Sequence, residues 1–143
     1  MEAPTGDPEQ PVASRWWYWI VAYPVVGLLA IPFFGLVAVF FFVTMATIEG
    51  AGGTIAGPVI LVVMLFAAIL AFSFVLLAFV VFVMLPVALY FDAKAVAQTD
   101  LDWEPDPFVY AILGALQFFV TPIIGLMVAI YYLYRRHTDV GVP

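Results

Sequence analysis

The chain has 143 residues, of which 66% are hydrophobic and only 10% charged, with a net charge of −6. One domain of this length cannot hide so much apolar surface in a core, because its outer surface would still face water. Four basic residues form no patch for nucleic acid, and the absence of cysteine excludes disulfides, thiolate metal sites and thiol nucleophiles.

Long stretches without ionisable side chains dominate the sequence. None occurs between Arg15 and Glu49, between Glu49 and Asp92, or between Asp106 and Arg135. A helix facing water would need a polar stripe, and these stretches have none. The sequence predicts an all-α integral membrane helical bundle of about three transmembrane helices, the first two unusually long. The transmembrane domain would cover residues 15–137, with spans near 16–47, 59–91 and 108–134.

The remaining segments are short and polar. Residues 1–14 combine prolines with acids, which is typical of a disordered tail, and residues 138–143 form a C-terminal tail. A glycine-rich segment at 48–58 predicts a turn, and residues 92–107 form an acidic loop. We expect the first apolar stretch to stay in the mature protein, because it is far longer than the apolar part of a signal peptide and follows an acidic tail.

The first apolar stretch is too long for one perpendicular span. As a straight helix it would measure about 48 Å, against a hydrocarbon core of about 30 Å. Either its first turns lie in the membrane interface, or the helix tilts and kinks at Pro24 and Pro32. A re-entrant segment within this stretch is a further alternative. Pro86 and Pro122 are the candidate kinks of the later spans.

Three spans would place the N-terminal tail and the acidic loop on one side, and the glycine-rich turn and C-terminal tail on the other. Lys and Arg then tie, with Arg15 and Lys94 against Arg135 and Arg136. Because the two C-terminal arginines are adjacent at a helix end, the positive-inside rule favours an external N-terminus and a cytoplasmic C-terminus in the plasma membrane.

Aromatic and arginine residues mark the ends of the apolar stretches, as at membrane interfaces. We expect the arginines to contact anionic headgroups. The predicted interfacial anchors are Trp16, Trp17, Trp19, Trp103, Tyr131, Tyr134, Arg135 and Arg136.

Few polar groups lie at depth: the candidates are Thr44, Ser73, Gln117 and Thr121. The amide of Gln117 either lines a pore or ligand site, or forms an interhelical hydrogen bond with Ser73 or Thr44. We favour the bond. Thr121-Pro122 is either a gating hinge or a packed kink, and we favour packing. Small residues four apart would allow close helix approach; these pairs are Ala67 and Ala71, Ala111 and Ala115, and Gly125 and Ala129.

The acidic loop is a candidate cation site, because Asp100, Asp102, Glu104 and Asp106 alternate along the chain. The pattern lacks the glycine and the length of an EF-hand loop, so we favour a solvated acidic surface. A single histidine, His137, excludes a bis-histidine haem or copper centre within one chain. The sequence predicts no catalytic residue, no metal and no cofactor.

Three segments in the C-terminal third carry a resemblance: Tyr90-Phe91-Asp92, Trp103-Glu104-Pro105, and the end from Tyr131 to His137. Together they resemble small uncharacterised multi-pass membrane proteins of halophilic archaea. The acid excess and single lysine fit such an organism. The resemblance implies a plasma-membrane location and no defined activity, and it transfers no catalytic residue.

The function favoured by these observations is non-enzymatic. The chain would be a structural or accessory component of a membrane assembly, in contact with lipid and associating with itself or with larger membrane proteins. One alternative is an oligomeric channel or transporter for a small solute, lined by Ser73, Gln117 and Thr121. A weaker alternative is a membrane-embedded enzyme that acts on lipid, with a metal in the acidic loop.

Overall fold

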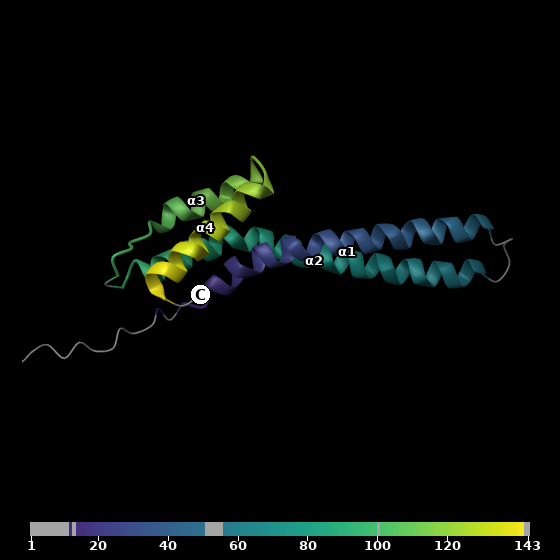
Figure 1. The fold of residues 1–143 in the computed structure, drawn as a ribbon, viewed down its shortest axis with the longest axis horizontal. Helices are drawn as coiled ribbons and strands as arrows, with labels where there is room; N and C mark the ends of the chain where they lie inside the picture. The colour runs from purple at the N-terminus through teal and green to yellow at the C-terminus, as the bar shows by residue number, and fades with distance from the viewer. Residues whose placement is uncertain (1–11, 13, 51–55, 100, 142–143) are drawn as a thin grey trace, which may run out of the picture. The chain divides into compact units, whose positions relative to one another are not determined.

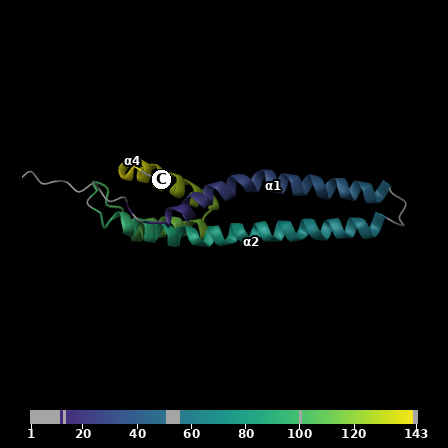
Figure 2. The same ribbon diagram turned by 90° about the horizontal axis from the view of Figure 1, so that it is seen from below.

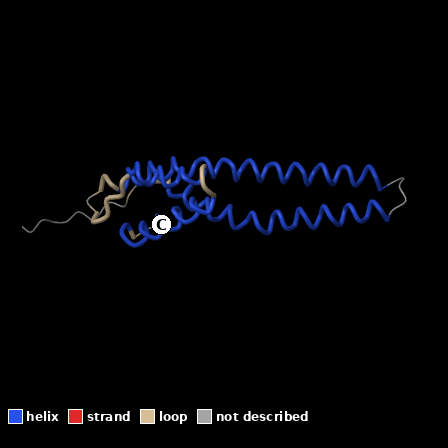
Figure 3. The backbone as a smooth tube through the Cα atoms, turned by 90° about the horizontal axis from the view of Figure 1, so that it is seen from above, coloured by secondary structure: helices blue, strands red, loops and turns tan. Residues whose placement is uncertain are grey.

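The computed structural model describes residue 12 and residues 14–50, 56–99 and 101–141, with the backbone alone for residues 48–50 and 56. Within these ranges the chain is helical without any strand (Figure 3), which confirms the predicted all-α class. The elements (Figure 1) are α1 Trp17–Gly50, α2 Ala56–Val96, α3 Pro107–Ala115, the short 3₁₀ helix η1 Leu116–Phe118, and α4 Pro122–Val140.

Helices α1 and α2 are each long and apolar enough to cross a membrane, over Trp17–Thr47 and Gly57–Val96. The weighed alternative of a re-entrant segment in the first stretch does not hold, because α1 is one uninterrupted helix. It continues through Pro24 and Pro32, whereas a bend at these prolines stays a prediction. The centre of the predicted glycine-rich turn, residues 51–55, lies outside the described residues.

The chain divides into two compact units, one of Val25–Val81 and one of Met1–Pro24 with Phe82–Pro143. We call the first the hairpin unit and the second the core unit. In the hairpin unit α1 and α2 lie side by side (Figure 2), and Phe74 stacks on Phe33 with ring centroids 4.3 Å apart.

A seam of the less exposed side chains joins the two helices of the hairpin unit. Their spacing alternates between three and four residues, the period that brings two helices together along one narrow stripe. On α1 the seam consists of Val26, Ala30, Phe33, Val37, Phe40 and Thr44, and on α2 of Met64, Ala67, Ala71, Phe74 and Ala78. The predicted small pair Ala67 and Ala71 thus lies between the helices.

The rest of the hairpin unit presents large apolar side chains outward. Leu28, Ile31 and Phe42 are 69%, 74% and 71% exposed, and Leu61 and Phe72 on α2 are similar. A soluble protein does not expose a contiguous apolar surface of this extent. The surface therefore requires an apolar environment, such as lipid. In such an environment the backbone N–H and C=O groups must bond to each other, as they do in a helix.

The third apolar stretch differs most from its prediction. We predicted one span over 108–134 with a kink at Pro122, but the chain breaks there into α3 and α4, which pack against each other. The residue before a proline is pushed out of the helical region, and Thr121 is extended at φ −168° and ψ 146°. Its hydroxyl oxygen accepts from Ile123 N at 3.4 Å and so caps α4. The result is a helical hairpin (Figure 1).

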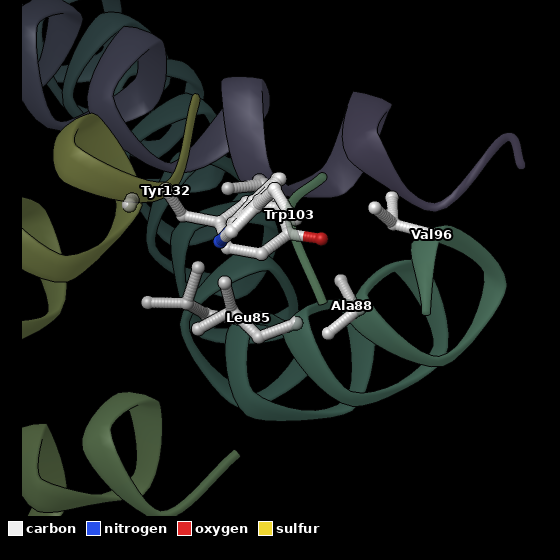
Figure 4. Packing of buried hydrophobic residues seen from close by; sticks show 9 residues of the cluster. Leu85, Ala88, Val96, Trp103 and Tyr132 are labelled. Carbon is white, nitrogen blue, oxygen red and sulfur yellow. The ribbon is translucent and has the colours of Figure 1, made fainter. Parts of the chain in front are cut away.

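The core unit buries an apolar cluster beneath this helical hairpin. Side chains of α1, α2, α4 and the loop after α2 converge there, and Figure 4 shows Trp103 and Tyr132 next to each other above Leu85 and Ala88. The complete cluster is Ile20, Leu85, Ala88, Leu89, Ala93, Val96, Trp103, Ala129 and Tyr132. The C-terminal part of α2 is therefore the centre of a packed core as well as the end of an apolar helix.

Candidate functional site

A buried ion pair joins α4 to α2 in the core unit. Arg136 Nε donates to Asp92 Oδ2 at 2.9 Å, and Tyr132 Oη donates to the same oxygen at 2.9 Å. The three side chains are shielded from solvent, with Asp92 0% and Arg136 2% exposed. Asp92 Oδ1 is also buried and accepts no hydrogen bond within the described part of the chain. These residues form the most polar point in an otherwise apolar core.

Local helix geometry aligns the three groups. Tyr132 and Arg136 are four residues apart, so they lie on the same face of α4. Asp92 lies one turn before the end of α2, where the long apolar run ends. Ala129, one turn before Tyr132 on the same face, is fully buried and lets α4 approach the core closely.

The electrostatics of the site favour a fixed arrangement. Burial raises the pKa of the Tyr132 phenol far above its ordinary value, and the charge and hydrogen bond of Asp92 raise it further against the opposing effect of Arg136. Tyr132 therefore remains a neutral donor to the carboxylate. A buried charge that loses its partner costs several kcal/mol, so each member of the pair depends on the other.

Aromatic rings enclose both C-terminal arginines. The guanidinium of Arg136 lies 5.8 Å from the ring of Trp17, and that of Arg135 lies 5.7 Å from the ring of Trp103. Trp103 in turn contacts Tyr132, with ring centroids 5.4 Å apart. Cations at these distances are attracted to the ring faces, so the rings contribute to holding the C-terminal helix.

The predicted membrane sides of Asp92 and Arg136 are wrong, and so are the predicted interfacial positions of Arg136 and Trp103. A contact of 2.9 Å cannot bridge a hydrocarbon core of about 30 Å, so Asp92 and Arg136 cannot lie on opposite membrane sides. Arg136 is buried against Asp92 and does not reach headgroups. Arg135 pairs with Asp139 at 3.4 Å and its side chain is 40% exposed, so its predicted headgroup contact stays a prediction. Trp103, predicted as an interfacial anchor, is only 8% exposed and belongs to the core.

The other predicted anchors keep exposed surface. Tyr131 and Tyr134 are well exposed on α4, and Trp16 and Trp19 are partly exposed near the start of α1. Trp17 is less exposed and stacks on Tyr18 with centroids 4.0 Å apart. Their contact with a membrane interface stays a prediction.

The buried amide of Gln117 compensates for a proline in another helix. Gln117 Nε2 donates to the carbonyl oxygen of Phe82 at 2.9 Å. This carbonyl lies four residues before Pro86, which has no N–H to donate to it. The favoured interhelical hydrogen bond is therefore present, but its acceptor is a backbone group that the proline leaves free. Neither Ser73 nor Thr44 is the partner.

The two hydroxyls proposed as partners bond within their own helices instead. Thr44 Oγ1 donates to Phe40 O and Ser73 Oγ donates to Ile69 O, each at 2.8 Å. This is the usual local arrangement of such residues in an apolar helix, where a hydroxyl satisfies itself on the preceding turn. Both hydroxyls belong to the hairpin unit, whereas Gln117 belongs to the core unit.

Glycines make the contacts around Gln117 possible. A Cβ on Gly125 would collide with Gln117 Oε1 and lie 2.9 Å from Tyr23 Oη, whose hydroxyl donates to Pro122 O at 2.9 Å. A Cβ on Gly114 would lie 2.7 Å from Leu89 Cδ1. The predicted pair Gly125 and Ala129 is thus buried on α4 at a close approach.

The acidic loop shows no metal centre in its described part. Asp106 Oδ1 accepts from Phe108 N at 2.8 Å and from Val109 N at 3.2 Å, which makes it the N-cap of α3. Across the described residues, no three His, Asp or Glu side chains gather in a way that could hold a metal ion. Asp100 lies outside these residues.

In comparisons with known proteins, no family model, no curated protein and no solved structure matches the chain. The chemistry of the site therefore rests on its own geometry. The carboxylate, phenol and guanidinium bind one another inside a closed core, an arrangement that fastens helices together.

Sequence reasoning overlooked Asp92 and Tyr132. A lone aspartate directly after a long apolar run needs a partner, and Tyr132 and Arg136 offer two donors on one helical face. These two signals together could have indicated the pair.

We predict strong coupling between Asp92 and Arg136. Asp92→Leu or Arg136→Met alone should lower the free energy of unfolding by about 3–5 kcal/mol, because each leaves a buried group unpaired. Asp92→Leu combined with Arg136→Met should cost less than either single change. Unfolding in mixed micelles, followed by tryptophan fluorescence, measures these values. Asp139→Asn at the more exposed pair is the control and should cost at most ~1 kcal/mol. Additive costs at Asp92 and Arg136 would contradict the coupling.

We also predict that Pro86 and Gln117 compensate for each other. Gln117→Leu should cost about 1–3 kcal/mol, because the Phe82 carbonyl loses its donor. Pro86→Ala supplies an N–H to that carbonyl, so Gln117→Leu should cost markedly less in the Pro86→Ala background. The same unfolding assay on the four combinations decides this. An equal cost of Gln117→Leu in both backgrounds would contradict the proposed compensation between Pro86 and Gln117.

Proposed function

We propose that the protein is a non-enzymatic integral membrane component with two spanning helices and a C-terminal helical hairpin that enters one leaflet. It would act as a structural or accessory part of a membrane assembly, associating with itself or with larger membrane proteins. The supporting observation is that polar groups of the candidate site, among them Gln117, Thr121 and the Asp92–Arg136 pair, bond within the chain. Two oxygens of these groups, Asp92 Oδ1 and Gln117 Oε1, accept no hydrogen bond within the described residues, but both are buried.

Helix lengths support this placement. In the hairpin unit, α1 from Val25 to Gly50 is about 39 Å long, which suffices for a hydrocarbon core of about 30 Å. The excess length of α1 and α2 belongs to the core unit, where it packs against α4. Together with the part of α2 from Phe82 to Asp92, the length of the hairpin unit exceeds the hydrocarbon core, so the tilt expected from the sequence stays a prediction.

The C-terminal hairpin enters the membrane only partway in this proposal. Gln117, in the 3₁₀ helix η1 that follows α3, bonds to Phe82, which lies ten residues before Asp92 on α2. At about 1.5 Å per residue this corresponds to a depth of roughly 15 Å, half of the hydrocarbon core. The connection from α3 to α4 is suitably apolar, with Phe119 85% and Val120 65% exposed.

This arrangement moves the N-terminus to the cytoplasmic side, whereas the sequence analysis placed only the C-terminus there. With both ends of the C-terminal hairpin on one side, all four basic residues, Arg15, Lys94, Arg135 and Arg136, share that side. The positive-inside rule then favours a cytoplasmic location for both termini.

Single cysteines in this cysteine-free chain test the topology. Gln98→Cys and Thr138→Cys should react with a membrane-impermeant maleimide from the cytoplasmic side, and Glu49→Cys from the external side. Labelling of Gln98→Cys and Thr138→Cys from opposite sides would restore a third span. External labelling of both would retain the hairpin and reject the orientation.

Reconstituted liposomes test the function. We expect ion and small-solute flux equal to that of protein-free liposomes, and energy transfer between copies labelled at Thr138→Cys above that of random proximity when lipid is in excess. Flux that the protein induces and that Gln117→Leu abolishes would favour the channel instead. Energy transfer at the random level would remove self-association and leave larger partners. Release of products from radiolabelled phospholipid would overturn the non-enzymatic assignment.

A further inference from the structure

An open apolar groove lies between α2 and α3 in the core unit, with a volume of about 400 Å³. Val87, Tyr90 and Phe91 line it on the α2 side, and Phe108, Ala111 and Ile112 on the α3 side. It is separate from the buried ion pair, whose residues do not line it.

Small and large residues alternate to create the groove. At one end Gly114 holds α3 close to α2, because a Cβ there would lie 3.2 Å from Pro86 Cα. At the other end Tyr90 and Phe108 meet edge to face with centroids 5.8 Å apart. Between these contacts Ala111 is too short to reach across. The predicted close approach at Ala111 and Ala115 is therefore replaced by a hollow, and Gly114 makes the close contact.

Two exposed basic residues, Lys94 and Arg15, lie close in sequence to residues that line or contact this groove. Lys94 lies three residues after Phe91 and seven after Val87, so it continues the groove-lining stripe of α2. Arg15 directly precedes Trp16, whose ring stacks on Phe91 with centroids 4.9 Å apart. Across the described residues, neither Lys94 nor Arg15 forms a salt bridge, whereas Arg135 does.

We propose that the groove binds one acyl chain of an anionic phospholipid, with its phosphate at Lys94 and Arg15. The size of the groove argues against a docking helix: a single helical turn, about 10 Å across and 5.4 Å high, already fills roughly 400 Å³. A thin, flexible acyl chain fits such a hollow. The two cations select a headgroup of negative charge.

Headgroup charge, and not the acyl chain, provides the selectivity. A lipid tail is as apolar in the bilayer as in the groove, so the groove alone does not distinguish between lipids. One basic residue near a phosphate is worth about a fivefold preference. The proposed site thus moves headgroup contact from Arg136, which pairs internally, to Lys94 and Arg15.

Lipid-selectivity measurements on the full chain test this inference, which rests on the proposed membrane placement. The protein is reconstituted in phosphatidylcholine with spin-labelled phosphatidylglycerol or phosphatidylcholine as probe, and the motionally restricted fraction of each probe gives the relative association constant. We expect the wild type to prefer the anionic probe. Lys94→Gln and Arg15→Gln should each reduce the preference about fivefold, or to unity if less remains. Arg135→Gln, which removes the same charge, should leave it within twofold.

Groove-filling variants provide a second measurement. Ala111→Leu and Ala111→Phe should reduce the restricted fraction of the anionic probe, whereas Ala68→Phe on an exposed part of α2 should not. An equal loss from Arg135→Gln and Lys94→Gln would show general surface charge and overturn the site. No preference in the wild type, or full preference in both Ala111 variants, would also overturn it. These readouts are independent of flux and self-association, so they fail separately from the proposed function.

Discussion

The buried pair of Asp92 and Arg136 is the constraint on which the core unit depends. It fixes the last turns of α4 against the last turns of α2 through contacts of 2.9 Å, with Tyr132 as a second donor to the same oxygen. Removal of either member would leave the other as an uncompensated buried charge, which strongly destabilises a fold. The C-terminal helix is therefore tied to α2, and the path of the intervening chain follows from that.

A second set of contacts completes the path by accounting for backbone groups. Pro86 leaves the carbonyl of Phe82 without its helical donor, and Gln117 supplies one from the 3₁₀ helix η1. Gly114 and Gly125 allow α3 and α4 to approach closely enough for this bond to form. Gln117, which the sequence analysis considered as a possible pore lining, thus donates a hydrogen bond to a backbone carbonyl that a proline leaves without its helical donor.

The same internal pairing determines which charges remain available at the surface. Arg136 is buried against Asp92 and so cannot provide the headgroup contact expected of a basic helix end, whereas Arg135 forms a more exposed pair with Asp139. In the proposed lipid site, Lys94 and Arg15 take the role of headgroup contacts. The proposed structural role and the proposed lipid site are therefore two consequences of one packing arrangement.

The sequence by itself determined the helical class, the apolar surface and the two long helices, because lack of charge over a long run leaves the backbone no alternative to helix in an apolar solvent. It also marked Pro122 as the point where the third apolar stretch deviates, but it predicted a kink there, because prolines such as Pro24, Pro32 and Pro86 are accommodated within long helices. Only the tertiary structure decided that the chain reverses there. Reversal depends on Asp92 meeting Arg136 and Gln117 meeting Phe82, contacts between residues more than thirty positions apart that no local pattern encodes.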